Sequence, residues 1–228
     1  MSETPLSRSG SVLVDLSHAI RHGMTTYPGL PGPELSDYLT REASRSRYAP
    51  GTEFHIGRIS LVANTGTYLD SPFHRYTDGA DLAGVPLSAM ADLDGVVVAV
   101  GEGTRALDSP LTVPGGARGR AVLVRTGWDR HFGTERYGGD APFLTGTAAQ
   151  WLADEGAALV GIDSVNIDDV ADLARPAHSI LLRAGIPIVE HLRGLERLPA
   201  EGFRFHAAPP AVHGMGTFPV RAYAVVPG

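Results

Sequence analysis

Short apolar runs beside glycine constrain the fold of this chain more than any other feature of its sequence. Residues 96–100, 121–125 and 158–162 are each rich in valine, leucine, isoleucine or alanine and have glycines close by. Such short, continuous runs suit β-strands that are buried on both faces. The chain is therefore expected to form a sheet whose central strands are covered on both sides.

The remaining predicted elements are also short. Spacing of apolar residues predicts two helices, one over residues 147–155 with Thr145 or Thr147 as N-cap and one over residues 178–184 that Gly185 ends. Further strands are predicted at 12–16, 54–63, 186–190 and 220–226. Many strands with few helices between them predict an α/β fold with a mixed sheet.

The length of the chain favours one domain. A chain of 228 residues is large enough for one well-buried core and marginal for two. Residues 1–10 are expected to form a flexible polar tail, and residues 11–228 a single domain. The sequence shows no signal peptide and no apolar run of membrane-spanning length, so a cytoplasmic location is expected.

Composition excludes several classes of site. The formal net charge of −6 and the lack of a basic cluster give no reason to expect nucleic acid or an anionic membrane as partner. The chain has no cysteine, which excludes disulfides, thiolate nucleophiles and cysteine-based zinc sites. Any metal ion must then be held by His, Asp or Glu, and a small-molecule substrate is the expected partner.

The segment from Asn64 to His74 carries the clearest chemical signal. On an extended backbone Asn64, Tyr68 and Asp70 would point to the same face, and Pro72 would then turn the chain so that His74 swings back. A carboxylate and an imidazole together suit general acid/base work in a hydrolytic site. The plainer interpretation is a turn-capping Asp70 and a surface His74, but their clustering favours the functional one.

A second pair of candidate residues lies far along the chain. A helix of about seven residues spans ~10 Å and a strand of about five covers ~16 Å, so His178 and Glu190 could meet at one edge of the sheet. Taken alone, the pair is better explained as a helix-terminal His and a strand-end Glu that face water.

Aromatic residues suggest an apolar pocket. Trp128 follows a buried strand, where pockets of α/β domains open, although a tryptophan there is more often a core or rim residue. Together with Tyr27, Tyr68 and Phe73 it could line a pocket that accepts an aromatic substrate.

Several landmarks in order along the chain resemble the cyclase family of hydrolases, which includes bacterial kynurenine formamidase and isatin hydrolase. The segment 64–74 lies on the family signature His-x-Gly-Thr-His-x-Asp-x-Pro-x-His. The other landmarks are Asp15-Leu-Ser-His18, the Gly23–Gly29 segment, Arg125-Thr-Gly-Trp128, Gly161-Ile-Asp163, His178 with Glu190, and Pro219-Val-Arg221.

The resemblance implies a swivelling β/β/α fold, frequent homo-oligomers, and hydrolysis of an amide or lactam by a zinc- or manganese-bound water. Carried over residue by residue, it makes Asp70, His178 and Glu190 metal ligands and His74 the general acid/base. The two signature histidines that would also bind metal are replaced by Asn64 and Tyr68. A neutral histidine nitrogen is a good zinc donor, whereas an amide oxygen is weak and a phenol must ionise.

Two mechanisms therefore stay open. In one, at most one divalent ion is held by Asp70, His178 and Glu190 and activates a water. In the other no metal binds, His74 acts as acid/base beside Asp70 or Glu190, and Tyr68 with Asn64 positions or polarises a carbonyl.

The predicted function is arylformamidase-like hydrolysis of a carbon–nitrogen bond in a small, possibly aromatic substrate, by a dimer or tetramer. One alternative is a metal-independent cyclase or isomerase of a small carbonyl compound. Another, from a different class, is a non-catalytic family member that binds a small molecule or a protein.

Overall fold

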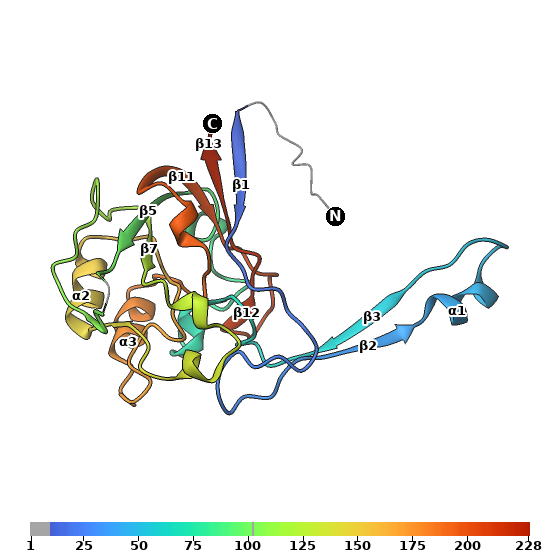
Figure 1. Ribbon diagram of the computed structural model, residues 1–228. Helices are drawn as coiled ribbons and strands as arrows, with labels where there is room; N and C mark the ends of the chain where they lie inside the picture. Colours follow the sequence, from blue (N-terminus) through green and yellow to red (C-terminus); the bar gives the residue numbers. More distant parts are fainter. Residues whose placement is uncertain (1–9, 102) are drawn as a thin grey trace.

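The computed structural model describes residues 10–101 and 103–228, and in this part of the chain a nine-stranded sheet dominates (Figure 1). The strands in spatial order are β1 (Ser11–Asp15), β13 (Tyr223–Pro227), β11 (Glu201–His206), β5 (Leu93–Ala99), β7 (Ala121–Arg125), β9 (Leu159–Ile162), β10 (Ile188–Glu190), β4 (Tyr68–Asp70) and β12 (Thr217–Pro219). Strands β5, β7, β9 and β10 run parallel, and the other neighbours pair antiparallel. The mixed α/β fold predicted from the sequence is confirmed.

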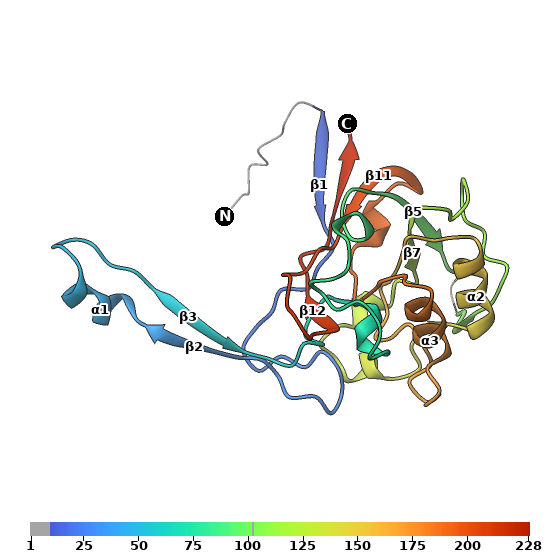
Figure 2. The same ribbon diagram turned by 180° about the vertical axis from the view of Figure 1, so that it is seen from behind.

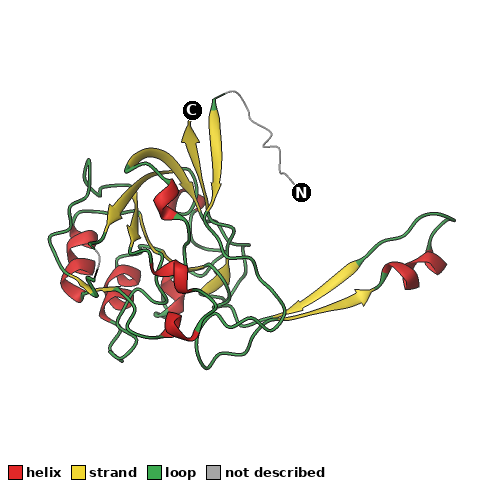
Figure 3. Ribbon diagram, in the orientation of Figure 1, coloured by secondary structure: helices red, strands yellow, loops and turns green. Residues whose placement is uncertain are grey.

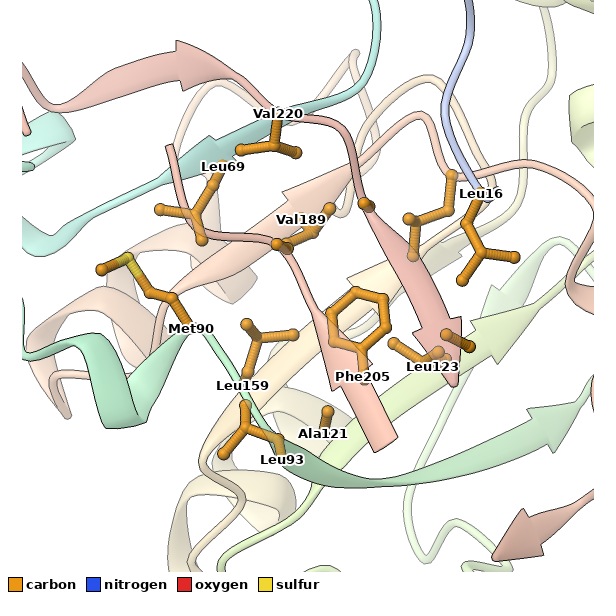
Figure 4. Close-up of a cluster of buried hydrophobic side chains, with 14 of the residues drawn as sticks. Leu16, Leu69, Met90, Leu93, Ala121, Leu123, Leu159, Val189, Phe205 and Val220 are labelled. Carbon is orange, nitrogen blue, oxygen red and sulfur yellow. The ribbon is translucent and has the colours of Figure 1, made fainter. Parts of the chain in front are cut away.

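The sheet curls around its own hydrophobic core. Leu69 from β4 and Phe205 from β11, which lie on opposite sides of the parallel strands in the sheet order, join one buried cluster with Leu123 of β7 (Figure 4). Such a cluster requires the sheet to bend so that its two ends approach each other. Strands β10, β4 and β12 are neighbours at one end of the sheet order, and both of their pairings are antiparallel.

Helices cover the other face of the parallel strands. Helices α2 (Gly146–Asp154) and α3 (Pro176–Arg183) pack over Val122 and Val160 in a second buried cluster (Figures 1 and 3). The central strands are therefore buried on both faces, as their continuous apolar runs predict.

Both predicted helices are confirmed, with one shift. Helix α2 has Thr145 as its N-cap, whose hydroxyl accepts from the Ala148 N–H. Helix α3 starts at Pro176, two residues earlier than expected, because proline is well suited to the first helical turn. The shift places His178 inside the first turn of α3.

A two-stranded arm projects from the body (Figures 1 and 2). It consists of β2 (Glu34–Leu39) and β3 (Ile56–Ser60), with α1 (Arg41–Ser44) near its tip. The strand predicted over 54–63 is present as β3 but is shorter, and it ends at Ser60 before the 64–74 segment. Gly66 has a left-handed φ of 69°, so the alternation assumed from Asn64 onward is also broken.

The remaining elements are short. A small sheet pairs β6 (Ala106–Leu107) with β8 (Phe143–Leu144). The 3₁₀ turns are η1 (Arg45–Arg47), η2 (Pro72–His74), η3 (Leu87–Ala89), η4 (Trp128–His131), η5 (Glu135–Gly138) and η6 (Leu195–Arg197). Within the described ranges, none of the helices has the length and apolar character needed to cross a bilayer. Of the predicted tail over 1–10, all but Gly10 lies outside the described residues.

Candidate active site

The register of three short strands assembles the site. In β4, Asp70 lies opposite Thr217 of β12, and Tyr68 lies opposite Glu190 of β10. Because side chains alternate along a strand, these four residues share one face of the sheet, while Leu69 enters the core. Residues from three distant parts of the sequence are thereby brought together by pairing.

Asp70 lies at the base of this face and is fully buried. Its Oδ1 accepts a hydrogen bond from the Thr217 hydroxyl, while its Oδ2 is buried without a hydrogen-bond partner. Burial alone would raise the pKa of Asp70, but His178, His74 and Thr217 together lower it. An ionised, partly unpaired carboxylate in this position is costly unless a cation faces it.

His178 faces Asp70 from helix α3. Its Nδ1 lies 2.7 Å from Oδ2 of Asp168, and its Nε2 lies 3.7 Å from Oδ2 of Asp70 and 3.6 Å from Oε1 of Glu190. Burial lowers the pKa of His178, but Glu190, Asp168 and Asp70 outweigh burial and raise it to about 10. When the imidazole is neutral, its hydrogen stays on Nδ1 beside Asp168, which leaves Nε2 as a free donor atom for a metal.

His74 ends the turn η2 and is the most open member of the group, with 35% of its side chain exposed. Its Nδ1 lies 2.7 Å from the Thr217 hydroxyl and 3.7 Å from Oδ1 of Asp70. Thr217 has one hydrogen, which it gives to Asp70, so the contact with His74 requires the hydrogen on Nδ1. The Nε2 of neutral His74 is therefore a proton acceptor.

Gly216 makes this arrangement possible. A Cβ at Gly216 would overlap the backbone of His74, and the Gly216 carbonyl accepts from the Ser71 N–H at 2.7 Å. Only glycine lets β12 approach η2 closely enough for Thr217 to hold His74.

Tyr68 points to the same face but joins a buried network. Its hydroxyl lies 2.6 Å from Oε2 of Glu190 and 3.3 Å from Nε2 of His191, whose Nδ1 lies 2.8 Å from the Tyr137 hydroxyl. Burial, then the charges of Glu190 and Asp70, raise the pKa of Tyr68. Tyr68 therefore stays a neutral phenol that donates to Glu190, and a chain of hydrogen bonds runs from Tyr137 through His191 to Glu190.

Glu190 links the network to His178. Its Oε1 accepts from the Ile167 N–H at 2.6 Å and its Oε2 accepts from Tyr68. Burial, with the charge of Asp70, raises the pKa of Glu190 to about 7 against the opposing effect of His178. His178 and Glu190 lie 3.6 Å apart and both are buried, so the interpretation that the two side chains face water is wrong.

A pocket of about 470 Å³ opens over this face. Tyr27, Asn64, Tyr68, His74, His178 and Glu190 line it together with Pro28, Gly29, Leu30, Arg75, Asn166 and Arg175. The structure does not bring Phe73 or Trp128 to its wall. Phe73 is half-buried on the turn η2, and the Trp128 ring donates from Nε1 to the Tyr137 carbonyl and lines a different pocket.

Sequence reasoning missed several residues that build the site. Thr217 carries no motif and becomes relevant only through its pairing with Asp70. Asp168 offered a weak signal, since it lies in the polar stretch after β9. His191 and Tyr137 gave none, because their role depends on contacts with Tyr68 across the fold.

The donor atoms fit one divalent ion. Asp70, His74 and His178 each offer a ligand atom within 4.8 Å of the others; Glu190 is not in this group and approaches it at Nε2 of His178. The separations of 3.7 Å and 3.6 Å from His178 Nε2 to Asp70 and Glu190 are too long for hydrogen bonds. They are close to the edge of roughly 3.4 Å that a tetrahedral zinc site has with ligands at about 2.0–2.1 Å. The unpartnered Oδ2 of Asp70 points to the same conclusion.

Comparison with known proteins gives the class. The model of a family described as putative cyclase matches residues 14–169, which is more than half of the chain, so this protein belongs to the cyclase family. The kynurenine formamidase of Paracidovorax citrulli is 26% identical over 220 residues, covering 95% of this chain and 97% of the relative. That of Bacillus cereus is 28% identical over 221 residues, with 92% and 95% covered.

Solved structures show the same fold. An isatin hydrolase bound to the product analogue thioisatinate superposes with a TM-score of 0.80 at 21% identity, over 96% of this chain and 94% of the other. A potential metal-dependent hydrolase with cyclase activity superposes with a TM-score of 0.77 at 24% identity, over 96% of this chain and 99% of the other. The predicted family and fold are confirmed, and the chain is a hydrolase of the cyclase family.

Proposed function

We propose that this hydrolase cleaves the carbon–nitrogen bond of a small amide, formamide or lactam, with aryl formamides as reference substrates. The observation that carries the proposal is His74, a partly exposed imidazole that Thr217 holds beside Asp70 and His178 at the pocket wall. The names of the relatives, kynurenine formamidase and isatin hydrolase, support the same class of bond.

The chain's own residues supply the proton chemistry. The Nε2 of His74 accepts a proton as a water oxygen adds to the carbonyl carbon. The same nitrogen returns the proton to the amide nitrogen as the carbon–nitrogen bond breaks, which leaves a carboxylic acid and an amine. Thr217 fixes the imidazole so that one ring nitrogen faces the substrate throughout.

We also propose that Asp70, His178 and Glu190 hold one zinc or manganese ion. Such an ion would polarise the carbonyl and lower the pKa of a bound water. The metal-free alternative gives carbonyl polarisation to Tyr68 and Asn64. Tyr68 is 1% exposed and its hydroxyl hydrogen points to Glu190, which weighs against that assignment.

Metal analysis beside a formanilide hydrolysis assay tests both statements. The expected result is about one divalent ion per chain and turnover that a chelator removes and that added Zn²⁺ or Mn²⁺ restores. Full turnover by metal-free protein would contradict the metal assignment. No turnover of any amide, formamide or lactam by metal-loaded protein would contradict the proposed hydrolysis.

The protein is proposed to work as a homo-oligomer. Large apolar side chains are exposed on the β2–β3 arm and its tip: Leu35, Tyr38, Tyr48, Phe54, Ile56 and Ile59. A two-stranded ribbon is marginal on its own, and a concentrated exposed apolar surface marks a protein contact. Light scattering should give a multiple of 24.0 kDa for the native chain and a lower mass for Ile56→Asp with Ile59→Asp, whereas a native monomer would contradict the proposal. The cytoplasmic location stays a prediction.

A further inference from the structure

Two arginines line the pocket beside its two imidazoles. Arg75 follows His74 directly, and Arg175 precedes helix α3 three residues before His178. Each cation is therefore placed at the pocket by the same local element that places a site histidine.

Neither arginine has an ion-pair partner among the described residues. Arg183 pairs with Asp78, and Arg105 binds the Asp169 carboxylate through two nitrogens at 3.0 Å and 2.8 Å. Arg175 contacts Asp169 only through its backbone carbonyl, which accepts from Nη1 at 2.7 Å. The charge of Asp169 is thus already engaged by Arg105, and Arg175 keeps nitrogens for a ligand.

Each arginine is constrained by a local contact or by its backbone. Arg175 has φ 48° and ψ 59°, a left-handed conformation that a non-glycine residue adopts only where the structure imposes it. The guanidinium of Arg75 lies 5.2 Å from the centre of the Tyr76 ring, and the Tyr76 hydroxyl donates to the Ser179 carbonyl of α3 at 2.8 Å. These contacts tie the segment after η2 to the helix that Arg175 precedes.

The charges of the pocket are divided between its base and its rim. Asp70 and Glu190 are buried at the base, whereas Arg75 is exposed and Arg175 half-buried. On a chain of net charge −6, two unpaired arginines at one cavity favour an anionic ligand group there. Guanidinium groups bind carboxylates through paired hydrogen bonds, which gives orientation as well as affinity.

We propose that Arg75 and Arg175 form a carboxylate subsite, so that the substrate is an amide with a carboxylate on the part that stays at the pocket rim. Tyr27 and Leu30 line the same pocket and suit an apolar or aromatic body. The inference rests on the proposed amide hydrolysis at His74, and it adds the charge of the substrate to it.

A matched pair of substrates tests the inference. Formanilide is neutral, and 2-formamidobenzoate is the same molecule with a carboxylate on the ring. We expect the native protein to prefer the carboxylated substrate by about 10-fold in kcat/KM, mostly through KM, and to lose part of that preference at high salt. In Arg75→Gln and Arg175→Gln the ratio of the two kcat/KM values should fall toward one.

Arg183→Gln is the control, since Arg183 lies on α3 and stacks on Tyr76 at 4.9 Å but does not line the pocket. It should keep the native ratio. A native ratio near one, or an unchanged ratio in both arginine variants, would overturn the subsite.

A binding measurement separates this outcome from failure of the proposed hydrolysis. Titration calorimetry with 2-acetamidobenzoate and acetanilide requires no turnover. Suppose that neither formanilide nor 2-formamidobenzoate is hydrolysed. The subsite is still supported if 2-acetamidobenzoate binds more tightly than acetanilide and if Arg75→Gln removes this difference. Equal or absent binding of both probes to the native chain overturns it.

Discussion

The two ends of strand β4 lead to parts of the site with opposite surroundings. At one end Asp70 leads into η2 and His74, which is 35% exposed at the pocket. At the other end Tyr68 is 1% exposed, and its hydroxyl is bound by Glu190 and His191. We call these the open half and the buried half of the site.

The difference shows what a tyrosine at position 68 does. A phenol with a raised pKa stays protonated. Tyr68 therefore acts as a hydrogen-bond donor to Glu190 and not as a metal ligand. The open half keeps groups that can exchange protons or hold a cation. Chemistry is therefore expected from the open half, and support of Glu190 from the buried half.

Removing the proton acceptor of the open half should have the largest effect. His74→Gln is expected to lower kcat by about 10²–10⁴-fold with little change in the melting temperature, because a partly exposed side chain is replaced by one of similar size. Steady-state kinetics and thermal unfolding measure the two. His213→Gln, at a position 95% exposed, is the control. Near-native kcat in His74→Gln would show that the open half does not carry the chemistry.

Displacing His74 without changing it should have the next largest effect. Gly216→Ala adds a methyl group that overlaps the His74 backbone. The backbone must then shift, which disturbs the hydrogen bond between His74 and the Thr217 hydroxyl. A shift of about 1 Å at a catalytic group costs roughly 10²-fold, so kcat should fall by about that factor. Gly214→Ala is a nearby control with open space at its Cβ, although its φ of 71° makes it slightly strained. Equal kinetics in the two variants would contradict the role of Gly216.

Breaking the buried half should affect stability first. Tyr68→Phe leaves Oε2 of Glu190 buried without a donor, which should cost about 1–3 kcal/mol in the free energy of unfolding. Tyr137→Phe removes only the hydroxyl that contacts His191, at the far end of the hydrogen-bond network. It should lower the free energy of unfolding by less, because no buried charge loses its donor. Urea unfolding gives both values, with Tyr223→Phe on β13 as control. A Tyr68→Phe chain as stable as the control would show that the network does not support Glu190.

The sequence predicted the fold and the proximity of Asp70 and His74 for physical reasons. Continuous apolar runs such as 121–125 identify central strands, because burial on both faces leaves a local pattern. Asp70 and His74 are four residues apart, so their proximity is also local. Thr217 and His191 became site residues only through pairing and packing across more than a hundred residues, which no local pattern records.

The predicted aromatic pocket shows the same limit. Tyr27 lines the pocket, whereas Trp128 uses its indole N–H to hold the Tyr137 carbonyl. A sequence identifies an aromatic residue at a strand end but not the direction of its ring.

The dependence of folding stability on acid pH should reveal the histidines of the buried half. Beside the buried half, burial lowers the pKa of His18 to about 4 with help from Arg193 and Arg21, and lowers that of His191 to about 3. In the unfolded chain these imidazoles titrate near 6.5, so acid protonates the unfolded state first. Their contribution to stability is complete above pH 6.5 and is lost as the pH falls toward 4.

His178 and Glu190 act in the opposite direction. The pKa values of His178 and Glu190 are raised, to about 10 and about 7, so their contributions are complete at low pH and are lost as the pH rises through those values. The histidines with lowered pKa values and the groups with raised pKa values thus change the pH dependence of stability in opposite directions. Comparing the native chain with a variant that lacks one group isolates the contribution of that group.

His18→Gln provides that difference. It removes one imidazole whose folded form stays neutral, so between pH 7 and 5.5 the native chain should lose about 1 kcal/mol more stability than the variant does. Urea unfolding at the two pH values measures this, and His213→Gln should follow the native chain because its imidazole is exposed. Parallel pH dependence in native and His18→Gln chains would mean that acid reaches His18 in the folded state, and the buried half would then not be closed to protons.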